Sequence, residues 1–276
     1  MIIQHNMQSA NTNRQLGITT GNLSKSTEKL SSGYRINRAG DDAAGLSISE
    51  KMRGQIRGLE QASTNAQDGI SLIQTAEGAL NETHSILQRM RELTVQAAND
   101  TNVSVDRASI QKELQALTSE ITRIGSQTEF NTMKLLGGSF SATALNLQVG
   151  ANSGQNISFN IQDMRASALE LTQTAIGSAV STYTKATAFI SVVNAAITKV
   201  SDQRSKLGAV QNRLEHTIAN ADNTAENLQA AESRIRDVNM ANEMVTYSKN
   251  NILQQAAQSM LAQANQSSQG VLSLLR

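Results

Sequence analysis

The sequence predicts a mainly α-helical protein: an elongated, coiled-coil-like bundle of long helices with a small β-hairpin, plus a paired N- and C-terminal helix domain. Two observations predict the helices. Apolar residues recur every seven positions over long stretches, and the 276 residues include no proline. A third observation predicts the hairpin, because two short segments alternate apolar and polar residues on either side of a turn bounded by glycines.

The composition excludes several classes of protein. Gln, Asn, Ser and Thr make up 102 of the 276 residues and aromatics only 3%, so a bulky aromatic core is not expected. The absence of cysteine excludes disulfides, thiolate metal sites and a cysteine nucleophile. A formal net charge of +1 argues against nucleic acid as a partner, and no window approaches the ~18 apolar residues of a membrane-inserted helix.

The first segment, residues 1–33, shows a thin apolar stripe. Leu16, Leu23 and Leu30 lie seven apart with little charge around them, and Gly33 is suited to the left-handed residue that ends a helix. Residues 34–45 interrupt the period and form a predicted connector, in which Asp41 or Asp42 caps the following helix.

Long coiled-coil seams follow the connector. Over residues 46–98 one seam position is occupied by Leu59, Ala66, Ile73, Leu80, Leu87 and Thr94, and the other by Ala62, Gly69, Ala76, Thr83, Met90 and Ala97. A second helix over residues 106–125 carries Ile110, Leu114, Leu117, Ile121 and Ile124 at alternating steps of four and three. We expect these helices to pack against each other.

The predicted hairpin lies near residues 143–163, with strands at 145–149 and 157–161 and a turn between Gly150 and Gly154. Helix returns from about residue 169, with a seam of Val193, Val200, Leu207, Leu214, Ala221, Leu228 and Ile235. The seam then changes register and continues through Val238, Val245 and Ile252. The predicted domains are therefore a terminal helical pair (1–33 and 237–276), the connector (34–45) and a rod (46–236).

No residue pattern indicates catalysis or a cofactor. His5, His84 and His216 have no ligand-type residue at metal-binding spacing, and no glycine-rich phosphate loop follows a strand, so we expect no enzyme, no metal and no cofactor. Arg35, Arg38, Asp41 and Asp42 allow two interpretations, an anion site or a connector whose charges pair with one another and cap a helix. The second is favoured.

Four stretches resemble bacterial flagellin, in the order and at the places where that family has them. They read LSSGYRINRAGDDAAGL at 30–46, QRMRELTVQAAN at 88–99, AENLQAAESRIRD at 225–237 and NILQQAAQSMLAQAN at 251–265. Only residues 162–184 separate the hairpin from the long returning helix. The chain therefore resembles a short, core-only flagellin without large variable outer domains.

The resemblance implies a structural subunit that polymerises into the flagellar filament for swimming motility. It implies an extracellular location, reached through the flagellar type III apparatus. The implied partners are other copies of the chain, an export chaperone, the filament cap and hook-junction proteins, and a Toll-like innate receptor of an animal host. A hook-filament junction protein is the nearer alternative, and a chemoreceptor-like signalling coiled coil a more distant one.

Three sets of site residues follow. We expect subunit packing through Leu16, Leu23, Leu30, Val245, Ile252 and Met260. The resemblance implies an innate-receptor face of Gln88, Arg89, Glu92, Leu93 and Glu113. It also implies an export chaperone on the C-terminal helix, covering the apolar residues Ile252, Leu253, Met260, Leu261, Leu272 and Leu275.

Overall fold

The computed structural model describes residues 6–274, with the side chains of Ala175 and residues 268–274 left out of the description. The chain divides into two compact units, Met1–Gly54 with Glu226–Arg276, and Gln55–Ala225. Two long helices, α2 (Ala43–Ala97) and α6 (Tyr183–Arg236), contribute residues to both units. The prediction of a mainly helical chain with a small hairpin is confirmed.

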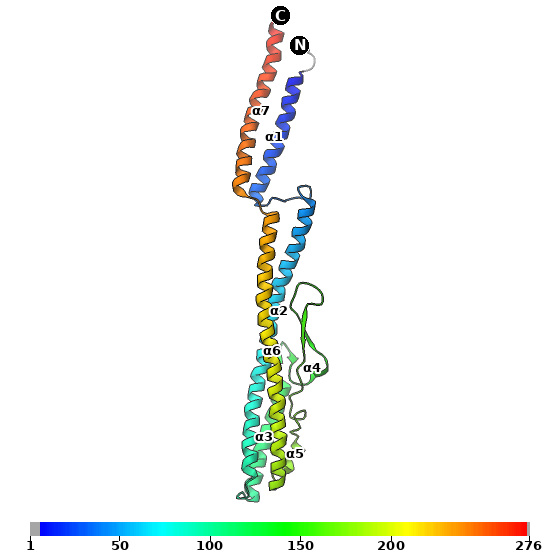
Figure 1. The fold of residues 1–276 in the computed structure, drawn as a ribbon, viewed down its shortest axis with the longest axis vertical. Helices are drawn as coiled ribbons and strands as arrows, with labels where there is room; N and C mark the ends of the chain where they lie inside the picture. Colours follow the sequence, from blue (N-terminus) through cyan, green and yellow to red (C-terminus); the bar gives the residue numbers. More distant parts are fainter. Residues whose placement is uncertain (1–5, 275–276) are drawn as a thin grey trace. The chain divides into compact units, whose positions relative to one another are not determined.

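The first unit pairs the two ends of the chain. Helix α1 (Met7–Ser32) lies beside α7 (Met240–Leu274), as Figure 1 shows. The Asn6 side chain caps α1 by accepting a hydrogen bond from the Ser9 backbone N–H at 2.9 Å. Gly33 ends α1 in the predicted left-handed conformation, with φ at 76°, and its N–H donates to the Lys29 carbonyl.

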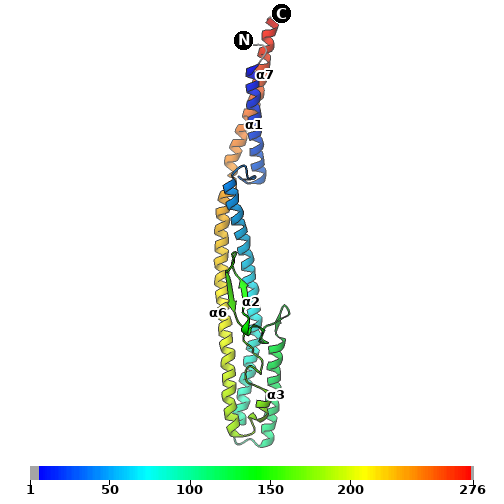
Figure 2. The ribbon, with the colours of Figure 1, turned by 90° about the vertical axis from the view of Figure 1, so that its right-hand side faces the viewer.

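The second unit has one apolar core built by α2, α3 (Ser104–Gln127) and α6, which run alongside one another (Figure 2). The two seams predicted along α2 are buried, except that Leu59 is only half-buried. On the facing helices Leu114 and Ile121 of α3, and Val193, Val200 and Leu207 of α6, have at most 1% of their surface exposed. The heptad prediction is therefore confirmed for this unit.

The predicted hairpin is present as strands β3 (Leu145–Gln148) and β4 (Asn156–Phe159), which pair antiparallel with Leu147 opposite Ile157. Ile157 and Phe159 turn into the core, while Asn156 and Ser158 are exposed, as the alternation predicts.

Four short elements were not predicted. Two of them are the strands β1 (Glu129–Phe130) and β2 (Met133–Lys134), which have two residues each and form a hairpin. The other two are the helices α4 (Ser139–Ala142) and α5 (Gln173–Ala179). They escape pattern analysis because none spans enough residues to show a period. The helix expected from about residue 169 begins instead with α5 and then, after a break, with α6 at Tyr183. Within the described part of the chain, no helix is both long and apolar enough to cross a bilayer.

Candidate assembly and recognition surfaces

The α1–α7 pair meets along a polar seam. On α1, residues at alternating steps of three and four are half-buried or buried: Ser9, Thr12, Leu16, Thr19, Leu23, Ser26 and Leu30. On α7 the matching residues are Glu243, Tyr247, Asn250, Gln254, Ala257, Leu261 and Ala264. Among all of these only Ser26, Asn250 and Ala264 are fully buried. Seven of these fourteen residues are polar and the four leucines are only half-buried, so the seam supplies little hydrophobic stabilisation to the isolated pair.

Polar contacts join the far ends of the pair. The Asn6 side-chain amide donates to the Ala264 carbonyl at 3.1 Å, and the Ser9 hydroxyl donates to the Asn265 side-chain oxygen at 2.7 Å. These contacts set the register in which the N-terminal end of α1 lies against the C-terminal part of α7.

The six residues predicted for subunit packing divide into two groups. Leu16, Leu23 and Leu30 lie in the seam, whereas Val245, Ile252 and Met260 are 69%, 67% and 54% exposed. The expected continuation of the seam through Val245 and Ile252 is therefore wrong within the chain. The physical reason is that α7 turns a mixed set of residues, from Glu243 and Tyr247 to Ala264, toward α1, in a register two positions away.

The exposed side of α7 carries an apolar stripe, which the exposed Lys249 interrupts between Val245 and Ile252. We define the outer stripe of α7 as Val245, Ile252, Leu253, Ala256 and Met260, all of which are exposed. Val245 follows the seam residue Glu243 by two positions, about 200° around the helix, so the stripe faces away from α1.

Of the residues expected to meet a chaperone, Ile252, Leu253 and Met260 belong to the outer stripe, and Leu261 lies half-buried in the seam. Leu275 lies outside the described residues, and so does the side chain of Leu272.

Hydrogen bonds join the connector to the end of α6. A β-bridge joins Tyr34 to Asp237, and the Val238 N–H donates to the Gly33 carbonyl at 3.0 Å. The Arg236 guanidinium lies 4.8 Å from the centre of the Tyr34 ring and forms a 2.8 Å ion pair with Glu50 of α2. The hydrogen bond from Arg236 lowers the pKa of Glu50 below its ordinary value.

The charged residues of the connector do not pair with one another as expected. Arg38 forms an ion pair with Glu28 of α1 at 3.0 Å, and Arg35 donates to the Ile235 carbonyl. The Asp42 carboxylate accepts from the Gly45 N–H at 2.8 Å and so caps α2. Asp41 accepts the backbone N–H groups of Arg38 and Asn37, which lower its pKa. The two carboxylates therefore accept hydrogen bonds from backbone N–H groups, and the two arginines bind residues of α1 and α6.

The residues of the expected receptor face lie around one arginine. Arg89 of α2 donates to Glu113 of α3 at 3.0 and 3.1 Å and to Glu92 at 3.2 Å. The hydrogen bond to Glu113 is the main cause that raises the pKa of Arg89. Gln88 is also exposed and lies 3.0 Å from a ring nitrogen of His84. Leu93 is only 2% exposed and belongs to the core of the unit, so it does not contribute to the accessible surface.

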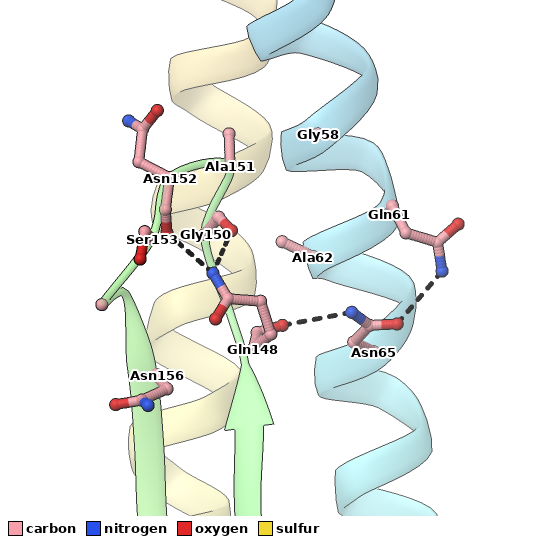
Figure 3. Close-up of a pocket in the computed structure, with 11 residues that line it drawn as sticks. Gly58, Gln61, Ala62, Asn65, Gln148, Gly150, Ala151, Asn152, Ser153 and Asn156 are labelled. Atoms are coloured by element: carbon pink, nitrogen blue, oxygen red, sulfur yellow. Dashed lines mark hydrogen bonds between the residues drawn. The ribbon is translucent and has the colours of Figure 1, made fainter.

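The tip of the β3–β4 hairpin lies close against α2, and amides line the space between them (Figure 3). The Asn65 side chain donates to the Gln148 carbonyl at 3.2 Å and accepts from Gln61 at 3.0 Å. Gly58 permits the approach, because a Cβ there would lie 2.8 Å from that of Ala151. The remaining hollow is about 490 Å³, and its lining carries no charged side chain.

Among the described residues, no group of three or more His, Asp or Glu side chains could hold a metal ion. His84 and His216 lie on helices of the second unit, and His5 lies outside the described residues. The polar seam of the α1–α7 pair was missed from sequence, although Thr12, Thr19 and Ser26 do show heptad spacing. That spacing of small polar residues was the available signal.

Comparison with known proteins places the two helical ends in one family. The model of the bacterial flagellin N-terminal helical region matches residues 3–141, and that of the bacterial flagellin C-terminal helical region matches residues 190–275. Together the two models cover more than half of the chain.

Full-length relatives indicate the same family. A flagellin from Halalkalibacterium halodurans is 58% identical over 276 residues, and one from Bacillus subtilis is 56% identical over 304 aligned positions. Each alignment covers 100% of both chains. A protein from Vibrio parahaemolyticus described as flagellar hook-associated has a TM-score of 0.60 over 71% of this chain and 100% of its own. At 12% identity that likeness shows the fold alone. The chain belongs to the bacterial flagellin family.

Proposed function

We propose that this chain is the structural subunit that polymerises into the bacterial flagellar filament. The observation that carries the proposal is the α1–α7 pair, which joins its two helices through a polar seam and leaves the outer stripe of α7 in solvent. Exposed apolar surface of this kind marks an interaction site. Additional copies of the pair would cover the stripe, and full-length relatives named flagellin support this choice of partner.

Electron microscopy and sedimentation of the purified chain test the proposal. The natural chain should form filaments, and Ile252→Asp should remain soluble, because it places a carboxylate in a contact that loses its water. Gln258→Asp is the matched control: it adds the same charge at an exposed position of α7 outside the outer stripe. A natural chain that forms no filament under any polymerising condition contradicts the proposal.

The outer stripe of α7 is also a surface that an export chaperone would cover before assembly. Ile252, Leu253 and Met260 would otherwise face the cytoplasm before the chain passes through the flagellar type III apparatus. Deletion of residues 237–276 should abolish retention by the chaperone in a pull-down and leave the melting of the second unit unchanged. Retention by the truncated chain would contradict this placement.

A recognition face for a Toll-like innate receptor is supported by Arg89, which is exposed and connects Glu92 to Glu113 across two helices. Arginine often contributes most to such interfaces. Arg89→Ala should weaken receptor activation by monomer at unchanged thermal stability. Arg123→Ala, which removes a similar exposed pair with Glu120, is the control. Equal activation by both variants would contradict the assignment.

The alternative of a hook-filament junction protein is less well supported, since the likeness to a hook-associated protein extends to fold only. Copy number separates the two functions, because a filament subunit is made in far larger amounts than a junction protein. Quantitative mass spectrometry of whole cells provides the measurement.

A further inference from the structure

The α1–α7 pair carries several methionines whose side chains lie in solvent. Met7 of α1 is 75% exposed, and Met240, Met244 and Met260 of α7 are 48%, 50% and 54% exposed. A thioether differs from an aliphatic side chain in one chemical respect, because oxidants convert it into a polar sulfoxide. The pair is therefore a part of the chain that an oxidant can change chemically.

The methionines of the second unit are better shielded. Met90 of α2 has no exposed surface, and Met164, in the segment after the β3–β4 hairpin, is 3% exposed. Met133 of β2 is exposed to 38%. Oxidation requires that the oxidant reach the sulfur atom, so a dilute oxidant should modify the α1–α7 pair before it modifies the core of the second unit.

Met260 is the methionine that lies within the outer stripe of α7. Its companions there include Ile252 and Leu253, so the stripe accepts aliphatic side chains. Leucine and methionine have similar helix propensities, and both are large and apolar. Neither helix formation nor hydrophobic packing therefore requires a sulfur atom at position 260. The sulfur adds a group that can be oxidised.

We propose that Met260 is a redox-sensitive modification site, at which hydrogen peroxide oxidises the thioether to a sulfoxide and so blocks assembly of the chain. The sulfur lone pair attacks one peroxide oxygen, and an S–O bond forms as the O–O bond breaks. The proton of the transferred hydroxyl group passes to the departing hydroxide, which becomes water. Sulfur loses two electrons in this step, and the peroxide gains them.

The sulfoxide would weaken assembly because its oxygen is a polar hydrogen-bond acceptor. Its neighbours in the outer stripe, Leu253 and Ala256, have no polar side-chain atom. Covering the stripe would therefore remove the sulfoxide oxygen from water, which costs free energy unless a partner donates a hydrogen bond. This inference rests on the proposed filament function and adds a means of regulating it by oxidants.

The modification is chemically reversible. A methionine sulfoxide reductase returns the thioether, while two thiols are oxidised to a disulfide and the sulfoxide oxygen leaves as water. An oxidised subunit could therefore regain the ability to assemble.

Treatment of the monomer with dilute peroxide, followed by removal of the peroxide with catalase, tests the proposal. Peptide mass spectrometry should find one added oxygen atom on Met260 and none on Met90 or Met164. The critical concentration for polymerisation of the oxidised natural chain should rise about tenfold or more. Melting of the second unit by circular dichroism should stay unchanged. Methionine sulfoxide reductase with a thiol should restore the original critical concentration.

Two substitutions separate Met260 from exposed methionines in general. Met260→Leu should polymerise like the natural chain without peroxide and should keep this critical concentration after peroxide treatment. Met244→Leu is the matched control, since Met244 is equally exposed on the same helix but lies outside the outer stripe. The interval from Met244 to Met260 places the two side chains about 160° apart around the helix. Met244→Leu should remain as sensitive to peroxide as the natural chain.

Three outcomes overturn the inference and leave the filament function intact. The first is an unchanged critical concentration for a natural chain in which Met260 is fully oxidised. The second is a Met260→Leu variant that peroxide inhibits as strongly as the natural chain, and the third is equal protection by Met244→Leu. Failure of the untreated natural chain to polymerise overturns the proposed function as well.

Discussion

Gly125, near the end of α3, shows how one missing side chain admits a neighbouring loop. A Cβ there would lie 3.2 Å from the backbone N and Cα atoms of Arg165 and 2.9 Å from its Cγ. Backbone atoms cannot move aside as a flexible side chain can. The segment after the hairpin is therefore held against α3 at a distance that only glycine permits.

Gly125→Ala should lower the free energy of unfolding by about 1–3 kcal/mol through overpacking. Chemical denaturation followed by circular dichroism measures the change. Gly78→Ala is the control within the same unit, because a Cβ at Gly78 would meet no atom of the described residues within 4 Å. It should raise stability by about 0.5–1 kcal/mol through helix propensity. Stabilisation by both substitutions would show that Arg165 does not lie against Gly125.

At the scale of elements, the seam of the second unit depends on fully buried aliphatic side chains such as Leu80, which has no exposed surface. Leu80→Ala should destabilise the unit by about 2–5 kcal/mol, because it leaves a cavity among packed helices. Thermal melting is the measurement. Glu82→Ala, two residues away and exposed, should change stability by no more than about 0.5 kcal/mol. Equal melting of the two variants would contradict the core placement of Leu80.

The junction between connector and α6 should respond to acid. Glu50 has a folded-state pKa below the ordinary value of 4.5, owing to its hydrogen bond from Arg236. Ionised Glu50 therefore contributes to the free energy of unfolding above its unfolded-state pKa. This contribution is lost as the pH falls through the folded-state pKa of Glu50. Asp41 adds a contribution of the same sign, because backbone hydrogen bonds lower its pKa. We expect the junction to loosen as the pH falls below the ordinary pKa values of these two carboxyl groups.

Tyrosine emission can follow this loosening, since the chain has no tryptophan and only three tyrosines. In a Tyr183→Phe, Tyr247→Phe background, emission reports on Tyr34, which stacks on Arg236. At pH 7, Glu50→Gln should already show the tyrosine emission that the chain with Glu50 shows only at acidic pH. An emission that stays constant from pH 7 to pH 3 would contradict the role of the Glu50–Arg236 pair.

Periodicity predicted the elements with apolar seams and failed where the contact is polar. Ala76 and Leu207 were assigned correctly because burial of aliphatic side chains leaves a seven-residue signal. Asn250 and Gln254 left no such signal, although they lie in the α1–α7 seam. Val245 and Ile252 have the hydrophobicity of seam residues but are exposed in the single chain. Sequence alone does not separate an apolar residue that packs within the chain from one kept for a partner.

The receptor-face residues show a similar limit. Arg89 and Glu113 are 24 positions apart, and their ion pair depends on where the turn between α2 and α3 falls. Leu93 was expected beside them, but it is adjacent to the seam residue Thr94 and shares its buried side. The resemblance supplied the segment, and only the packing of the helices determined which side chains remain accessible.

At the scale of the whole molecule, the two units should differ in resistance to protease. The α1–α7 pair has a polar seam and the second unit an apolar core, so the pair should open more readily in the monomer. Trypsin should cleave first at Arg14, Lys25 or Lys249, and assembly into filaments should protect these sites. Mass spectrometry of timed digests gives the order. Equal cleavage rates in monomer and filament would contradict the prediction.

The pairing of α1 with α7 also determines which parts of the chain can fold first during synthesis. The contact between Asn6 and Ala264 joins residues 258 positions apart, whereas Arg89 and Glu113 close a loop of only 24. Closing short loops costs less entropy, so α2 and α3 can fold together while α7 is still being synthesised. The terminal pair can form only when translation is almost complete. A chain released early from the ribosome would lack α7, and could be sorted from finished subunits because it offers no outer stripe to a growing polymer.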